Sequence, residues 1–144
     1  MEDLQLLLVD DETAFVETMA KRLTKRGLTV EGAQSGEEAL AKLSKNPRTD
    51  VVVLDVKMPG MDGIETLREI RRHYPLVEVI MLTGHATVET AISGMKLGAF
   101  DYLMKPCELD ELVAKVREAA AKKFGHEQKI VEARAKHIAL RRGD

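Results

Sequence analysis

Polar side chains that could do chemistry together follow the short apolar runs of this sequence. Four of five such runs end in them: Asp10 and Asp11 after the first, Asp55 after the third, Thr83 after the fourth and Lys105 after the fifth. In an open α/β sheet, the groups that follow parallel strands meet at one edge, where ligands bind. The sequence therefore predicts three carboxylates, a hydroxyl and an ammonium group in one crevice.

This set of groups is typical of phosphoryl chemistry assisted by a divalent cation. Three carboxylates in one crevice repel each other, and a hard cation such as Mg²⁺ is the usual means of holding them ionised together. Lys105 and Thr83 would offer positive charge and a hydrogen-bond donor to a phosphoryl group. Asp55 stands alone after a strongly apolar run, and a carboxylate can act as a nucleophile that forms an acyl phosphate.

The elements that must position these groups alternate between short apolar runs and longer segments of helical periodicity. We expect strands at 4–9, 28–33, 51–54, 77–82 and 100–104. The alternation is typical of a parallel sheet with crossover helices, so the fold class is α/β. The first, third and fourth runs are nearly all apolar and suit central strands, whereas the second is mixed and suits an edge.

Apolar residues at helical spacing predict the helix faces that cover the sheet. These residues are Phe15, Met19 and Leu23; Val88, Ala91, Ile92 and Met95; and Leu109, Leu112, Val113, Val116 and Ala120. Ser35 with Glu38 and Asp62 with Glu65 indicate helix starts, and Gly27 and Gly98 indicate helix ends. We also expect Gly125 to interrupt the last helix. An apolar seam of Ile130, Val131 and Ile138 continues beyond it.

Length and composition indicate one globular domain. The 144 residues are 44% hydrophobic and 32% charged, with a net charge of -2, which is ordinary for a single folded domain. No apolar run approaches the ~20 residues of a membrane-spanning helix, and the start lacks the basic segment of a secretory signal. The lone Cys107 agrees with a reducing compartment, so we expect a cytoplasmic protein that does not bind membranes.

Charge is concentrated at the C-terminal end. Residues 121–144 carry seven Lys or Arg against three Asp or Glu, which makes the tail +4 and leaves the rest at -6. We interpret the tail as a solvated helical extension, because it holds no nucleic-acid recognition motif. The sequence has no Trp and few other aromatic residues, which also argues against direct nucleic-acid binding by base stacking.

Four segments together give the chain a family resemblance. They are LLVDDE at 7–12, VVLDVKMPGMDG at 52–63, VIMLTGHA at 79–86 and GAFDYLMKP at 98–106. From Leu4 to about Lys122 the sequence resembles the receiver domain of bacterial two-component response regulators. The resemblance implies a flavodoxin-like (βα)5 three-layer sandwich whose five-stranded parallel sheet has the order 2-1-3-4-5. Residues 1–122 would form the receiver, and residues 123–144 a charged, helical extension or linker.

The resemblance also implies a role for each carboxylate. Asp55 matches the residue that accepts a phosphoryl group from a sensor histidine kinase. Asp11, Asp55 and the backbone carbonyl of Lys57 would bind Mg²⁺, and Asp10 would act largely through water.

Further residues match positions that respond to the phosphoryl group. Thr83 and Lys105 would contact its oxygens, and the peptide bond between Lys105 and Pro106 is expected to be cis. Tyr102 matches the aromatic switch residue that turns inward when Thr83 moves. The fourth helix, fifth strand and fifth helix would form the switch surface.

Two variable positions of such domains, here Lys57 and His85, are expected to tune the phosphoryl lifetime. The side chain of His85 would either order the attacking water or block it. Both interpretations are open at this point.

Several functions share parts of this pattern. A hydrolase with an aspartyl-phosphate intermediate needs a cap domain, for which the sequence has no insertion. A pure interaction module would have an inactive site, which the complete constellation argues against. The remaining alternatives are a receiver that docks on a downstream protein, and an N-terminal receiver fragment of a longer transcriptional regulator whose output domain is absent. Other expected partners are a sensor histidine kinase or phosphotransfer protein, and a second copy bound through the tail.

Overall fold

Strands and helices alternate strictly along the chain in a computed structural model that describes residues 4–141. The strands are β1 (Gln5–Val9), β2 (Thr29–Ala33), β3 (Val51–Leu54), β4 (Glu78–Thr83) and β5 (Asp101–Met104). The helices are α1 (Thr13–Lys25), α2 (Gly36–Lys45), α3 (Gly63–His73), α4 (Val88–Lys96) and α5 (Leu109–Arg141). Positions 1–3 and 142–144, the outer ends of the predicted receiver and extension, lie outside the described residues.

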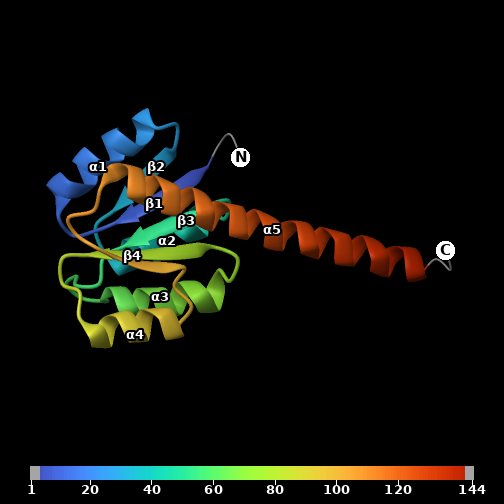
Figure 1. Cartoon of the computed structure of the whole chain (residues 1–144). Coiled ribbons are helices and arrows are strands. Elements are labelled where there is room, and N and C mark those ends of the chain that lie inside the picture. Colours follow the sequence, from blue (N-terminus) through green and yellow to red (C-terminus); the bar gives the residue numbers. More distant parts are fainter. Residues whose placement is uncertain (1–3, 142–144) are drawn as a thin grey trace.

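All five strands are parallel and lie in the order β2-β1-β3-β4-β5. Helices cover both faces, which gives three layers (Figure 1). One core, which contains Leu23 and Leu112, lies between the sheet and helices α1 and α5. A second core, which contains Leu43 and Leu67, lies under α2 and α3. The predicted flavodoxin-like α/β fold is thereby confirmed.

The pattern of strand burial follows from these layers. β1, β3 and β4 are buried almost throughout, while β2, at the edge of the sheet, alternates between exposed and half-buried residues before the buried Ala33. Val9 pairs with Leu54, so β1 and β3 end level with each other. Because both strands stop there, Asp10 and Asp55 emerge side by side at the carboxyl edge.

The predicted helix boundaries are also confirmed. The Ser35 side chain accepts a hydrogen bond from the Glu38 backbone N–H at 3.0 Å. The Asp62 side chain accepts a hydrogen bond from the Glu65 backbone N–H at 2.8 Å. Gly27 and Gly98 follow α1 and α4 with φ of +89° and +101°, a left-handed conformation that glycine adopts without a steric cost.

The apolar stripe of α4 does not face the sheet, and that prediction was wrong. Val88, Ile92 and Met95 are 78%, 49% and 47% exposed. Gly94 instead forms the inner side of α4: a Cβ there would lie 3.5 Å from the Tyr102 ring. Because a glycine faces the sheet, the bulky residues of α4 lie on its outer side.

The expected interruption at Gly125 is absent, since α5 runs unbroken from Leu109 to Arg141. The helix extends far beyond the rest of the domain (Figure 1). Glycine within a helix costs only about 1 kcal/mol relative to alanine, which the surrounding helix formers offset. No helix within residues 4–141 is long and apolar enough to cross a membrane.

Candidate functional site

Three carboxylates converge at the carboxyl edge of the sheet. Asp10 and Asp11 follow β1 and Asp55 follows β3. Each offers one oxygen, and these oxygens all lie within 4.8 Å of one another. Asp10 and Asp55 are 1% and 2% exposed, whereas Asp11 lies exposed at the rim.

Backbone groups fix the two buried carboxylates. Asp10 accepts a hydrogen bond from the N–H of Glu12 at 2.9 Å, and Asp55 accepts one from the N–H of Val56 at 2.8 Å. Burial raises the pKa of Asp55, and the negative charge of Asp10 adds to this effect. A hydrogen bond with Thr83 and the charge of Lys105 lower the pKa without cancelling the rise. The site therefore disfavours a third negative charge in the absence of a bound cation.

Lys105 supplies positive charge to the cluster. Its Nζ lies 2.6 Å from Asp10 Oδ2, 3.7 Å from Glu12 Oε1 and 3.9 Å from Asp55 Oδ2. Burial alone would lower the pKa of Lys105, but the hydrogen bond and charge of Asp10, with smaller contributions from Asp55 and Glu12, raise it. The side chain thus stays charged, and its peptide bond to Pro106 is cis.

An aromatic ring completes the surroundings of Lys105. The Nζ atom lies 4.1 Å from the centroid of the Phe15 ring. The sequence pattern placed Phe15 only in the apolar stripe of α1, so this contact was missed. Its position four residues after Asp11, in the first turn of α1, is the signal that could have suggested it.

The residues at this edge fit a hard divalent cation. Three carboxylates face one nearby ammonium group, so their combined charge is not balanced by the protein. Mg²⁺ favours carboxylate oxygens together with water, and the exposed rim at Asp11 leaves room for water. Asp10, Asp11 and Asp55 are the residues that would hold it, and coordination by the Lys57 carbonyl stays a prediction.

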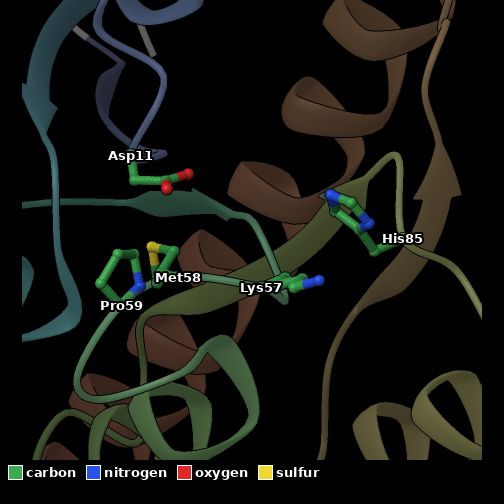
Figure 2. Close-up of a pocket in the computed structure, with 5 residues that line it drawn as sticks. All are labelled: Asp11, Lys57, Met58, Pro59 and His85. Atoms are coloured by element: carbon green, nitrogen blue, oxygen red, sulfur yellow. The ribbon is translucent and has the colours of Figure 1, made fainter.

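An open pocket of about 340 Å³ lies beside the carboxylates. It is lined by Asp11, Lys57, Met58, Pro59 and His85. Figure 2 shows that these side chains come from three loops, which follow β1, β3 and β4. The two predicted lifetime-tuning residues therefore border the same opening as Asp11.

Tyr102 is hydrogen-bonded to α4, and Thr83 is hydrogen-bonded to the loop that precedes α4. Thr83 is buried, and its Oγ1 accepts the N–H of His85 at 3.0 Å. The Tyr102 hydroxyl lies 2.7 Å from Thr90 Oγ1. Thr90 in turn forms a reciprocal cap with Thr87 at the start of α4. The contact with Thr90 was not foreseen, because nothing in the sequence pairs these two positions.

Gly63 allows α3 to begin directly against the segment after β3 that contains Asp55. A Cβ at Gly63 would lie 2.0 Å from the Asp55 carbonyl oxygen and 2.7 Å from Val56 Cα. The Gly63 N–H also donates to the Val56 carbonyl at 2.7 Å. Gly63 is thus the point of close approach between two backbone segments.

Fold and site together define a flavodoxin-like domain with an acidic centre and a lysine at the carboxyl edge of its sheet. The family model described as the response regulator receiver domain matches residues 6–117. The chain therefore belongs to the receiver domain family of response regulators.

Two of the relatives that match this chain are named as regulators. The chain is 42% identical over 113 residues to the DNA-binding transcriptional regulator NtrC of Salmonella typhimurium, a match that covers 78% of this chain and 24% of NtrC. It is also 42% identical to the response regulator MprA of a Mycobacterium species, over 78% of this chain and 49% of MprA. The chain thus spans about a quarter to a half of the length of these relatives.

Solved structures agree with this assignment. A CheY-like receiver domain protein from Methanospirillum hungatei superposes with a TM-score of 0.81 at 31% identity, covering 86% of this chain and 98% of that one. A receiver domain protein from Clostridium thermocellum gives a TM-score of 0.80 at 37% identity, covering 83% and 96%.

Proposed function

We propose that this receiver domain accepts a phosphoryl group on Asp55, with Mg²⁺, from a phosphohistidine of a sensor histidine kinase or phosphotransfer protein. The observation that carries the proposal is the buried Asp55 carboxylate, which has Lys105 Nζ at 3.9 Å and two more carboxylates nearby. A sensor kinase as donor places the domain in the cytoplasm. The domain acts as a switch, since its covalent change is made on itself.

The transfer converts the Asp55 carboxylate to an acyl phosphate. A carboxylate oxygen forms a bond to phosphorus while the bond from phosphorus to the donor nitrogen breaks, and the electron pair leaves with the imidazole. Asp55 must be ionised for this step, whereas burial favours its protonated form. Bound Mg²⁺ supplies positive charge that stabilises the carboxylates and the phosphoryl oxygens.

Lys105 and Thr83 stabilise the product. The Lys105 ammonium group needs only a short movement from Asp10 to reach an oxygen of the new phosphoryl group, since it already lies close to Asp55. The Thr83 hydroxyl, which also hydrogen-bonds with Asp55, donates to a second oxygen.

Movement of Thr83 is passed on to α4 and Tyr102. The backbone N–H of His85 donates a hydrogen bond to the Thr83 hydroxyl and therefore moves with it. The loop that contains His85 leads to Thr87, the N-cap of α4. Thr87 contacts Thr90, which contacts the Tyr102 hydroxyl. A shift at Thr83 therefore loosens the cap and frees Tyr102 to turn inward.

The proposed switch surface comprises α4, β5 and α5. Within this surface, α4 exposes the apolar residues Val88, Ile92 and Met95, and β5 exposes Met104, which is 64% exposed. Exposed apolar patches are typical of docking surfaces. The partner is either a downstream protein or an output domain of a longer transcriptional regulator; the length of the NtrC and MprA relatives supports the second.

Intact mass spectrometry tests phosphorylation directly. The protein is incubated with acetyl phosphate, with Mg²⁺ or with EDTA, beside Asp55→Ala and the exposed control Asp110→Ala. We expect one added phosphoryl group with Mg²⁺ in the wild type and in Asp110→Ala, and none in Asp55→Ala. Equal labelling of Asp55→Ala would overturn the proposal.

A further inference from the structure

The Lys105 ammonium group is held by two chemically different kinds of contact. Carboxylates approach it from Asp10, Glu12 and Asp55, at 2.6, 3.7 and 3.9 Å. The face of the Phe15 ring lies against it with the centroid 4.1 Å from Nζ. A cation at this distance from an aromatic face is attracted by the ring quadrupole, more strongly where water is excluded.

The two kinds of contact respond differently when a divalent cation binds the carboxylates. Asp10 and Asp55 belong to the group of carboxylates that fits a divalent cation, and a cation there competes with Lys105 for their charge. The cation does not compete with Lys105 for the Phe15 ring, because a hard cation prefers oxygen ligands. The ring contact therefore persists when the carboxylate contacts weaken.

Phe15 is well placed to keep a fixed position. Its ring is half-buried and packs against the core shared by α1, the sheet and α5. Phe15 also lies in the first turn of α1, immediately after the loop that carries Asp10 and Asp11. The same short segment thus carries two carboxylates of the cluster and the ring that contacts its lysine.

We propose that Phe15 is a positioning residue of the phosphorylation site: its ring holds the Lys105 ammonium group within reach of Asp55 while a cation engages the carboxylates. The proposal rests on the proposed phosphorylation of Asp55. It assigns to Phe15 a role beyond its packing in the apolar stripe of α1.

Phosphorylation rates of matched variants test this role. Phe15→Leu and Phe15→Met remove the ring and retain an apolar side chain, and Phe15→Tyr retains the ring. Phe100→Leu is the control, because Phe100 packs half-buried against the same core and its ring lies 5.8 Å from Lys122 instead. Rates are measured against acetyl phosphate concentration at saturating Mg²⁺.

Loss of the ring is expected to lower the rate at saturating donor by roughly three- to tenfold. The concentration that gives half the maximal rate changes less, since the ring does not contact the donor. Phe15→Tyr retains the wild-type rate, and Phe100→Leu stays within twofold of it. Equal rates in Phe15→Met and Phe100→Leu would overturn the proposal.

Proton NMR of Lys105 gives a second readout that needs no phosphoryl transfer. A ring face shifts the protons of the Lys105 Cε group upfield, so we expect this shift in the wild type with and without Mg²⁺, and its loss in Phe15→Met. Disappearance of the shift on adding Mg²⁺ would refute the positioning role. An unphosphorylated wild type would instead refute the proposed function, while the NMR result would still decide whether the contact survives the cation.

Discussion

Asp55 is subject to two opposing requirements. A nucleophilic carboxylate must be ionised, yet burial and the charge of Asp10 raise its pKa. Lys105 and Thr83 offset part of this cost. The cation-free site is therefore electrostatically unfavourable, which favours binding of a cation.

Replacing Asp55 with Asn is expected to stabilise the cation-free protein. The variant removes a buried charge next to Asp10 while its side-chain oxygen still accepts the Val56 N–H. We expect the free energy of unfolding to rise by about 1 kcal/mol at neutral pH, or roughly 2–4 °C in Tm at this chain length. Thermal unfolding in EDTA measures the change, with Asp110→Asn as the exposed control.

The pH dependence of this difference follows from the sign of the pKa shift. A carboxyl group with a raised folded-state pKa binds its proton more tightly in the folded protein than in the unfolded chain. Its ionisation therefore destabilises the fold above that pKa, and the cost is relieved as the pH falls through it. The gain in unfolding free energy of Asp55→Asn over the wild type should shrink in acid and on adding Mg²⁺. A gain that grows in acid would contradict the effect of burial on the Asp55 pKa.

His85 is expected to protect the acyl phosphate. Its side chain lines the open pocket beside Asp11, so Ala at this position gives water a wider path. We expect His85→Ala to shorten the phosphoryl lifetime roughly two- to fivefold, which corresponds to less than about 1 kcal/mol in the barrier. Decay of the phosphorylated protein, followed by intact mass, measures this, and an unchanged lifetime would remove His85 from the mechanism.

At the scale of elements, the strands could be predicted better than the orientation of α4, whereas the apolar stripes of α1 and α5 pack against the core as predicted. Apolar runs bounded by Asp10, Asp55 and Thr83 located β1, β3 and β4 to within a residue, because strands buried on both faces need continuous apolar sequence. The same reasoning failed for α4. Its apolar stripe indicated a buried face, but the close packing of Gly94 on Tyr102 turned that stripe outward.

The site shows the same division between local and tertiary information. The convergence of the carboxylates could be predicted, because it follows from strand direction. The contacts of Phe15 with Lys105 and of Thr90 with Tyr102 could not, because they depend on side-chain packing between elements distant in the sequence.

Replacing glycine with alanine is expected to have opposite effects on stability at Gly63 and Gly125. Gly63→Ala places a methyl group 2.0 Å from the Asp55 carbonyl oxygen, so we expect a loss of roughly 1–3 kcal/mol in unfolding free energy from overpacking. Gly125→Ala has open space around it within the helix, and we expect a gain of about 1 kcal/mol from helix propensity. Urea unfolding compares the two variants, and a tolerated Gly63→Ala would refute the close approach.

At the scale of the whole molecule, α5 belongs both to the domain and to its extension. Lys123 is buried and lies 2.9 Å from Asp50 and 3.3 Å from Glu127. The predicted boundary between residues 122 and 123 therefore lies within a continuous helix whose contacts with the domain reach past it. The extension itself projects into solvent (Figure 1).

The extension repeats apolar residues at a spacing that favours helix pairing. Phe124, Val131 and Ile138 are seven residues apart and each at least half exposed. A seven-residue repeat is typical of coiled coils, which supports the predicted pairing with a second copy. All three residues lie within the part of the tail that the structure describes, which ends at residue 141.

Val131→Glu is expected to weaken this dimer. A charge in the apolar seam should raise the dissociation constant at least tenfold, or about 1.4 kcal/mol, whereas Ala133→Glu, two residues away, should have little effect. Light scattering during gel filtration at several concentrations measures both. A wild type that remains monomeric throughout would exclude pairing through this helix.

The most direct test of the central claim is chemical trapping of the phosphorylated residue. The protein is incubated with acetyl phosphate and Mg²⁺, reduced with borohydride, which converts an aspartyl phosphate to homoserine, and analysed by peptide mass spectrometry. We predict homoserine at position 55, dependent on Mg²⁺, with Asp10 and Asp11 unchanged. Homoserine at another aspartate, with residue 55 still aspartate, would contradict Asp55 as the phosphoacceptor.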